Sequence, residues 1–217
     1  MSNVFIVGVT GGIGSRLAPK LIEAGHRVSG LHRRPEQDAA LREVGVTPYP
    51  GDLMEVTTED LVEATKGHDA IVFSAGAAGS GADRTTAIDY GTPVKLIEAA
   101  RINGISRLYL VSAFMDAGRD RPRKEGFEHY MKMKRQADNA VVASGLDWVI
   151  VRPATLVTED GNGRVNLERA IPYGNVARGN VAGVLAALID RPSVNREILE
   201  VTDGETPISR AVEAIRH

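Results

Sequence analysis

One stretch near the start of the chain, residues 4–17, limits most strongly what this sequence can fold into. It opens with four consecutive apolar residues, 4–7, which is typical of a β-strand buried on both faces. Apolar residues then recur at helical spacing over residues 13–22. Glycines at positions 8, 11 and 14 separate the two patterns. The order of strand, glycine-rich turn and helix predicts the first half of a dinucleotide-binding unit.

Each of the three glycines is needed in this turn for a different steric reason. Gly8 allows a tight reversal, Gly11 lets the backbone approach a pyrophosphate, and Gly14 lets the helix pack close to the strand. The phosphates would then lie on free amides at the helix N-terminus, where the helix dipole is positive. The cofactor-binding residues predicted here are Gly8, Thr10, Gly11, Gly12, Ile13 and Gly14. A glycine-rich turn that binds nothing is the alternative.

Strand and helix patterns alternate along the chain as far as Leu156. Further strands are expected at residues 27–31, 45–49, 69–73, 106–112 and 146–151, with helices at 36–44, 58–67, 83–101 and 127–144. This alternation predicts an α/β fold, a Rossmann-type doubly wound parallel sheet. Beyond Leu156 the pattern loosens into a glycine-rich turn at 161–163, a helix at about 178–190, a strand near 198–201 and a short final helix. We expect a single domain over residues 1–217, with 154–217 forming a small lid on the substrate side.

Composition excludes several classes of function. The chain has 26 Lys and Arg against 28 Asp and Glu, interspersed, which argues against nucleic acid or a membrane surface as a partner. It has no cysteine, and its five histidines lack ligand spacing, so no metal is expected. Because no apolar run reaches roughly 18 residues and no signal-peptide pattern opens the chain, a cytoplasmic protein is expected. A basic cluster near the predicted mouth of the active site is interpreted as a solvated lid, with an anion-attracting rim as the alternative: Arg119, Arg121, Arg123 and Lys124.

The turn after the second strand indicates which nucleotide is bound. In folds that prefer NAD, an acidic side chain about 20 residues beyond the glycines holds the ribose hydroxyls, whereas an arginine there suits a 2′-phosphate. This chain has Arg33 and Arg34 at that point, and no acid before Glu36. Two guanidiniums can bind a phosphate through charge-assisted hydrogen bonds, so NADP(H) is the predicted cofactor. A solvated basic turn is the alternative, and Arg16 is a further candidate for the same phosphate.

Tyr130 and Lys134 form a candidate catalytic pair. They are four residues apart on an expected helix, so their side chains share one face. A nearby ammonium favours phenolate over phenol, which would bring proton transfer by the tyrosine nearer to neutral pH. Ser112 ends the strand expected at 106–112, where its hydroxyl could hold a substrate carbonyl oxygen. A coincidence on an amphipathic helix is the alternative for the tyrosine–lysine spacing.

With these motifs in place, the whole chain resembles an atypical short-chain dehydrogenase/reductase of the NAD(P)-dependent epimerase or NAD(P)H-binding type. The resemblance is carried by Gly8, Gly11, Gly14, Arg33, Asp52, Ser112, Tyr130 and Lys134. It implies further cofactor contacts from Asp52, Leu53, Ser74, Ala75, Gly76, Lys134 and Pro153. The chain departs from the family at Asp89, where most members have asparagine, and in the short segment that follows Pro153.

The resemblance implies an NADPH-dependent oxidoreductase that acts on a small carbonyl or conjugated acceptor. Tyr130 would donate the proton, and Ser112, Lys134 and Asp89 would be the other catalytic residues. An NADP-dependent epimerase or dehydratase, and a non-catalytic NADP-binding redox sensor similar to the NmrA-like regulators, are the alternatives. A sensor has no use for a serine, tyrosine and lysine held together, so their joint presence favours an enzyme. The expected partners are the nucleotide and a small-molecule substrate. The identity of the substrate and the oligomeric state of the protein are left open.

Pro93 predicts a break in the helix expected at 83–101. Proline has no amide hydrogen, so the carbonyl of Asp89 loses its helical partner. We expect that carbonyl to turn to the Lys134 ammonium, directly or through a water, so that the main chain supplies an acceptor for proton transfer. The alternative is that Pro93 begins a separate helix, which Asp89 merely caps.

Overall fold

The computed structural model describes residues 1–115, 117 and 125–215, so the basic cluster at 119, 121, 123 and 124 lies outside the described residues. The strands are β1 (Asn3–Val7), β2 (Arg27–His32), β3 (Val46–Pro50), β4 (Ala70–Phe73), β5 (Arg107–Val111), β6 (Asp147–Pro153), β7 (Thr155–Val157), β8 (Arg164–Glu168), β9 (Asn175–Ala177), β10 (Glu197–Asp203) and β11 (Thr206–Pro207). The helices are α1 (Gly14–Glu23), α2 (Glu36–Glu43), α3 (Thr58–Thr65), α4 (Ala82–Thr85), the π-helix η1 (Thr86–Gly91), α5 (Thr92–Asn103), α6 (Glu125–Val142), α7 (Arg178–Ile189) and α8 (Ile208–Glu213). Within this part of the chain, no helix is both long and apolar enough to cross a membrane.

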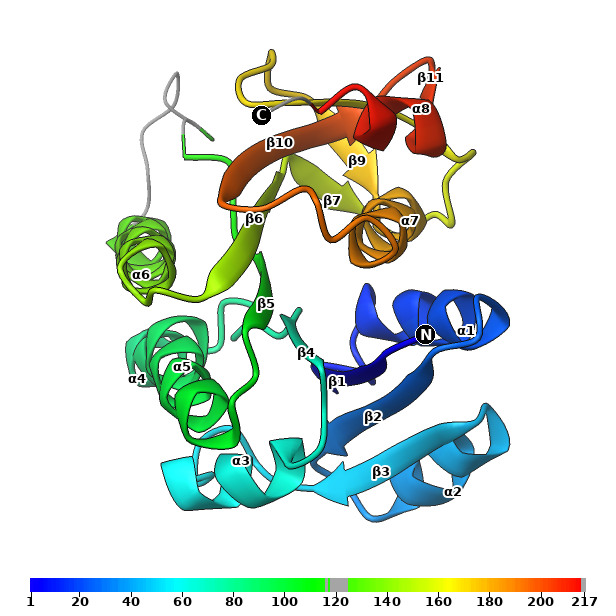
Figure 1. Ribbon diagram of the computed structural model, residues 1–217. Helices are drawn as coiled ribbons and strands as arrows, with labels where there is room; N and C mark the ends of the chain where they lie inside the picture. Colours follow the sequence, from blue (N-terminus) through cyan, green and yellow to red (C-terminus); the bar gives the residue numbers. More distant parts are fainter. Residues whose placement is uncertain (116, 118–124, 216–217) are drawn as a thin grey trace.

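The predicted doubly wound parallel sheet is confirmed. Nine of the described strands form one sheet in the order β11-β8-β10-β6-β5-β4-β1-β2-β3. Neighbours from β3 to β10 pair in parallel, and β8 pairs antiparallel with β10. The strands from β3 to β6 have the order of a Rossmann dinucleotide-binding fold. Helices cover both faces of the sheet (Figure 1).

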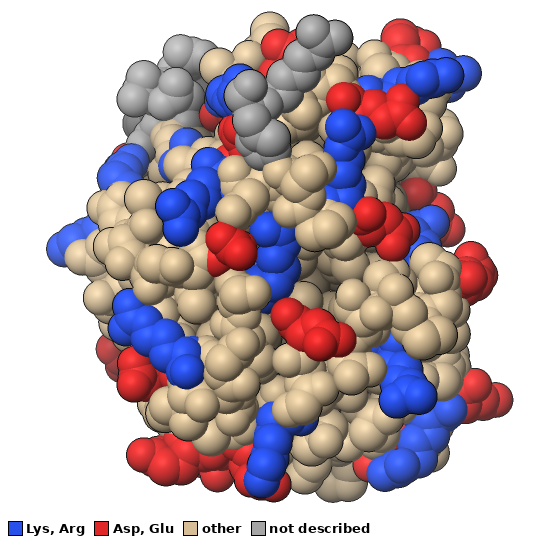
Figure 2. Space-filling model, viewed as in Figure 1, with Lys and Arg blue, Asp and Glu red and all other residues tan. Residues whose placement is uncertain are grey.

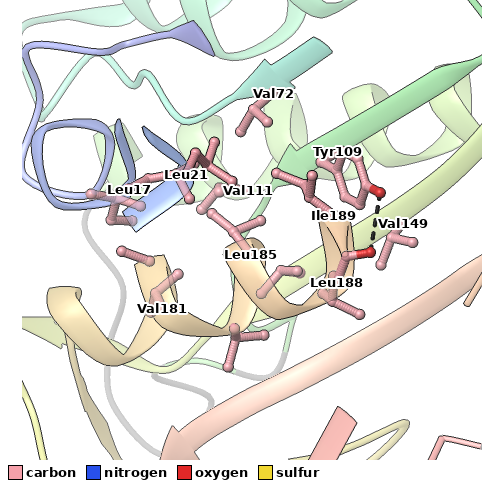
Figure 3. Packing of buried hydrophobic residues seen from close by; sticks show 14 of the residues in the cluster. Leu17, Leu21, Val72, Tyr109, Val111, Val149, Val181, Leu185, Leu188 and Ile189 are labelled. Carbon is pink, nitrogen blue, oxygen red and sulfur yellow. Dashed lines mark hydrogen bonds between the residues drawn. The ribbon is translucent and has the colours of Figure 1, made fainter. Parts of the chain in front are cut away.

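Each face of the sheet carries its own apolar core. On one face, Leu17 and Leu21 of α1 pack with Leu185 and Leu188 of α7 (Figure 3). On the other face, α3, α5 and α6 cover the alternate residues of the same strands. Strands covered on both sides need apolar residues at every position, which explains the uninterrupted apolar run in β1. On the face that Figure 2 shows, acidic and basic side chains are interspersed.

The order of the strands reverses direction between β1 and β4, and this point locates a binding crevice. In open α/β sheets, ligands bind beyond the carboxyl ends of the strands at such a switch point. The glycine turn follows β1, and a loop of small residues follows β4. These two segments touch: a Cβ at Gly8, whose φ is 94°, would lie 2.7 Å from the amide nitrogen of Ala75. A larger residue at Gly8 would therefore push the two loops apart.

The region after Leu156 contains strands that the sequence patterns did not predict. Strand β8 extends the main sheet, and β7 pairs in parallel with β9 in a separate two-stranded sheet. Strand β10, longer than the expected 198–201, pairs in parallel with β6 and joins this region to the central sheet. Strands β7, β9 and β11 have two or three residues each, too few to display a period of two.

Candidate active site

A cleft of about 850 Å³ opens at the switch point between β1 and β4. Most of the predicted site residues line it: Gly8, Thr10, Gly11, Gly12, Ile13, Arg33, Arg34, Asp52, Leu53, Ser74, Ala75, Gly76, Asp89, Ser112, Tyr130 and Lys134. Pro153 does not line it, because it is buried in β6 opposite Val201. Its predicted cofactor contact is therefore not supported. Gly14 lies just outside the cleft wall, at the first residue of α1.

The glycine turn fits the pyrophosphate of a dinucleotide. The amide of Gly11 donates to the carbonyl of Gly8 at 2.9 Å, which closes the turn. A Cβ at Gly14 would overlap that carbonyl oxygen, so only glycine permits this close packing. No side chain caps the N-terminus of α1, and its first turn holds no acidic residue. The amides of Ser15 and Arg16 donate to the carbonyls of Gly11 and Ile13, whereas the amides of residues 12–14 have no acceptor among the described residues. These free amides and the positive end of the helix dipole favour an anion.

The turn after β2 presents Arg33 and Arg34 to solvent at the edge of the cleft. The side-chain oxygen of Gln37 accepts both backbone amides, at 3.2 and 3.0 Å, and so fixes the turn. The Arg34 guanidinium lies 3.4 Å from the Glu36 carboxylate. Among the contacts of the described residues, the Arg33 side chain has no such partner, which leaves it the freer of the two to meet a phosphate.

Arg16 does not reach this turn. Its guanidinium donates to the carbonyls of Gly12 and Thr158, both at 2.8 Å, and to the Asp160 carboxylate at 2.7 Å. These bonds fasten the segment after β7 to α1, and Arg16 is not among the residues of the cleft wall. The suggestion that Arg16 binds the 2′-phosphate is therefore wrong.

The segments after β3 and β4 border the cleft, as the predicted cofactor contacts of Asp52, Leu53 and residues 74–76 require. An oxygen of the Asp52 carboxylate accepts the amide of Met54 at 2.9 Å, so Asp52 shapes its turn while it also lines the cleft. The amide of Ser74 donates to the carbonyl of Val7 at 2.8 Å, which holds the two carboxyl-terminal strand ends together. Gly76 is next to Asp89: a Cβ there would lie 3.3 Å from its carboxylate.

Tyr130 and Lys134 lie together on α6 at the inner end of the cleft. The Lys134 ammonium is 5.8 Å from the centre of the Tyr130 ring, so the two side chains share a face, as their spacing predicts. Lys134 is only 3% exposed. Its ammonium donates to the carbonyl of Val111 at 3.0 Å and lies 3.3 Å from the Asp89 carboxylate. Among the described residues, no group accepts from or donates to the Tyr130 hydroxyl, which leaves it open to a ligand.

The electrostatics of Tyr130 differ from the prediction. Burial raises the pKa of Tyr130 above its usual value of 10.0, and this effect exceeds the lowering by the Lys134 ammonium. The carboxylates of Asp89 and Asp138 raise it further. The expectation that Lys134 brings the pKa of Tyr130 down toward neutrality is therefore wrong, because the net shift is upward. Tyr130 is a phenol at neutral pH, and so a proton donor.

Asp89 contributes its carboxylate to the site. It is fully buried in η1, and one carboxylate oxygen accepts the amide of Ala77 at 3.0 Å while the other faces Lys134. In η1 the amide of Thr92 bonds back to the carbonyl of Ala87, one residue farther than in an α-helix. Pro93 then occupies the first turn of α5, where its missing amide costs no hydrogen bond.

The main-chain acceptor of Lys134 is therefore not the one that was expected. Lys134 bonds to the carbonyl of Val111, and no contact of the described residues joins it to the carbonyl of Asp89. The alternative of a separate helix that begins at Pro93 is wrong as well, because the backbone stays helical from η1 through Gly91 and Thr92 into α5, and Asp89 does not cap α5. Its side chain instead supplies the counter-charge of a buried lysine.

Asp138 is a site residue that the sequence interpretation missed. It lies one helical turn beyond Lys134 on α6, only 2% exposed, and one of its oxygens accepts from both the Nε and a terminal nitrogen of Arg152, at 3.0 and 2.8 Å. Burial raises the pKa of Asp138, while the Ser112 hydroxyl and Arg152 lower it in part. Ser112 Oγ is itself buried. The repeat of Tyr130, Lys134 and Asp138 every four residues was the available signal.

Comparison with known proteins agrees with this geometry. Residues 8–192 match the model of the NAD(P)H-binding family. The chain belongs to that family. The predicted resemblance to the atypical short-chain dehydrogenases/reductases is thereby confirmed, and a nicotinamide dinucleotide is the cofactor for which the cleft is built. Among the described residues, no group of three His, Asp or Glu side chains is placed to hold a metal ion.

Relatives within and around the NAD(P)H-binding family agree with this assignment. An uncharacterised sugar epimerase of Bacillus subtilis, YhfK, is 35% identical over 214 residues, covering 98% of this chain and 99% of that protein. A Bacillus halodurans structure described as an NAD-dependent epimerase/dehydratase has a TM-score of 0.90 at 32% identity, with 99% and 100% of the two chains covered. The anaerobilin reductase ChuY of Escherichia coli O157:H7 has a TM-score of 0.78 at 23% identity, covering 93% and 97%, and shares the fold. The chain is thus an NAD(P)-binding protein of an oxidoreductase- and epimerase-like family.

Proposed function

We propose that this protein is an NADPH-dependent oxidoreductase that reduces a small carbonyl or conjugated acceptor. One observation supports this most: a partly buried tyrosine, with a pKa that burial raises, lies beside a fixed lysine in the wall of a dinucleotide cleft. When bound, NADPH supplies the hydride. Tyr130 supplies the proton from its hydroxyl and regains one from water, so the acceptor gains both hydrogens.

Lys134 and its neighbours prepare the tyrosine for this role. The Val111 carbonyl and the Asp89 carboxylate fix the ammonium against the Tyr130 ring. As the phenol loses its proton, a fixed positive charge close by stabilises the phenolate that forms. Because Asp89 balances the lysine, the resting site carries little net charge and the tyrosine remains protonated.

The direction of proton transfer favours reduction over epimerisation. An epimerase that starts by oxidising a hydroxyl needs a base at this position, and a tyrosine acts as a base only as phenolate. Burial disfavours the phenolate of Tyr130. The names of the Bacillus relatives favour an epimerase or dehydratase, which is the second candidate. A non-catalytic sensor would leave the open Tyr130 hydroxyl without a role.

The pH dependence of the reaction tests this protonation state. Because reduction needs the phenol and burial raises the pKa of Tyr130 above its usual 10.0, kcat/KM should show no marked loss caused by Tyr130 between about pH 6 and pH 9, and should fall only at higher pH. Initial rates of NADPH oxidation with a carbonyl or conjugated acceptor across this range provide the measurement. A descending limb near about pH 7 to 8 that disappears in Tyr130→Phe would show that the tyrosine ionises near neutrality after all.

Cofactor preference depends on Arg33 in this proposal. We expect NADPH to bind at least about tenfold more tightly than NADH, about 1.4 kcal/mol, and Arg33→Ala to remove most of that difference. Calorimetric titration with both nucleotides measures it. Arg42→Ala is the matched control, because Arg42 is an exposed arginine of α2 that pairs with Asp38. Equal affinities in the wild type, or an unaltered preference in Arg33→Ala, would show that Arg33 does not bind the phosphate.

A further inference from the structure

Arg178 lies over the glycine turn, although 166 positions separate it from Gly12 in the chain. It is the first residue of α7 and lines the same cleft. A Cβ at Gly12 would lie 2.5 Å from Cδ and 2.9 Å from Nε of Arg178. The stem of the arginine therefore rests on the Gly12 backbone, and its guanidinium starts directly above the turn that fits a pyrophosphate.

The two arginines that meet Gly12 differ in how many partners they have. Arg16 engages each of its three guanidinium nitrogens, with two carbonyls and the Asp160 carboxylate as acceptors. Half-buried Arg178 donates from one terminal nitrogen to the Thr158 hydroxyl at 3.2 Å, and the described part of the chain gives it no carboxylate partner. A guanidinium has five N–H donors, and a partly desolvated charge is unfavourable without a counter-charge. Arg178 is thus equipped for an anion that the protein itself does not provide.

The helix that carries Arg178 is firmly anchored, so the arginine has a rigid base. The amide of Gly179 donates to the carbonyl of Glu159, and a Cβ at Gly179 would overlap the carbonyl of Asp160. Asn180 is 1% exposed, and its side chain bonds to the amide of Gly163 at 2.9 Å and to Asp203 at 2.7 Å. Beyond these residues α7 is buried against α1 (Figure 3).

We infer that Arg178 binds the pyrophosphate of the cofactor together with the glycine turn before α1. The free amides of residues 12–14 and the guanidinium of Arg178 meet at Gly12, so a diphosphate on this turn reaches both sets of donors. A planar guanidinium suits two phosphate oxygens at once. The residues after β7 would then serve cofactor binding through α7. This inference rests on the proposed binding of NADP(H).

Ligands that differ in the pyrophosphate test the inference. NADP⁺ and 2′-phospho-ADP-ribose contain the pyrophosphate, whereas adenosine 2′-monophosphate lacks it. The main variant is Arg178→Met, because methionine keeps an apolar stem on Gly12 and removes the charge. We expect Arg178→Met to weaken the first two ligands by about tenfold or more and to leave the third unaltered. Arg178→Lys should fall between, since lysine keeps the charge without the planar fork.

Two controls make the outcome specific. Arg33→Ala should weaken all three ligands, because each carries the 2′-phosphate. Arg16→Ala should leave the three affinities nearly unaltered while it lowers the thermal midpoint. Arg178→Met with undiminished affinity for NADP⁺, or with the same loss for adenosine 2′-monophosphate, would overturn the role of Arg178 alone. A wild-type protein that binds none of the three ligands would overturn the proposed function, and this inference with it.

Discussion

Replacing Tyr130 with phenylalanine is expected to lower turnover with NADPH by about 10²–10⁴-fold, the usual contribution of a positioned acid. The affinity for NADPH should hardly change, since the ring and its contact with Lys134 remain. Steady-state kinetics and a nucleotide titration on the same preparation separate the two effects. Tyr109→Phe is the matched control. Tyr109 is a buried tyrosine whose hydroxyl donates to the carbonyl of Leu188 on α7 (Figure 3), so its loss should affect stability and not turnover.

An unaltered turnover in Tyr130→Phe would mean that hydride transfer alone carries the reaction. Lys134→Ala helps to interpret either result. The resemblance to the family implies that this lysine also binds the nicotinamide ribose, so its loss should reduce both turnover and nucleotide affinity. If Lys134→Ala loses turnover but keeps its full affinity for the nucleotide, then Lys134 supports Tyr130 and does not bind the ribose.

Asp89→Ala is expected to reduce the free energy of unfolding by about 3–5 kcal/mol, because it leaves the buried Lys134 ammonium without its counter-charge. The amide of Ala77 would lose its acceptor in the same variant. Urea unfolding followed by circular dichroism measures the change. Asp89→Asn should lose less, since an amide oxygen can still accept a hydrogen bond from Lys134 or from the Ala77 amide.

Glu213→Ala provides the surface control for this experiment. Glu213 pairs with Arg210 at 3.0 Å on exposed α8, and exposed pairs of this kind contribute about 0–1 kcal/mol. A loss in Asp89→Ala no larger than in Glu213→Ala would contradict the structural importance of the Asp89–Lys134 pair. Nucleotide titration of Asp89→Asn then shows whether the pair also shapes the cleft.

The sheet up to β6 was predictable from sequence because its strands are apolar at nearly every position and glycines separate them from helices. After Leu156, α7, β10 and the final helix were predicted as well. The other strands of this region were not, because β7, β9 and β11 are too short to show a period and β8 depends on pairing with β10.

The residues of the candidate site were likewise predictable from sequence only where the signal is local. The glycine turn, Arg33 and the Tyr130–Lys134 spacing are local features, and they were found. The net pKa shift of Tyr130 was not, because it depends on burial by distant segments, which the four-residue spacing to Lys134 does not reveal. The contact of Arg178 with Gly12 likewise exists only in the folded chain.

Transfer of a deuterium label tests the central claim of NADPH-dependent reduction most directly. The protein is incubated with NADPH that carries two deuteriums at the nicotinamide C4, so that transfer from either face is labelled, and with a panel of small carbonyl and conjugated acceptors, and the products are analysed by mass spectrometry. We predict one deuterium in the reduced acceptor, with one equivalent of NADP⁺ formed for each product. Tight binding of NADPH with no label transferred to any acceptor, or an isomerised substrate with no net change in NADPH, would contradict the proposal and favour the sensor or the epimerase respectively.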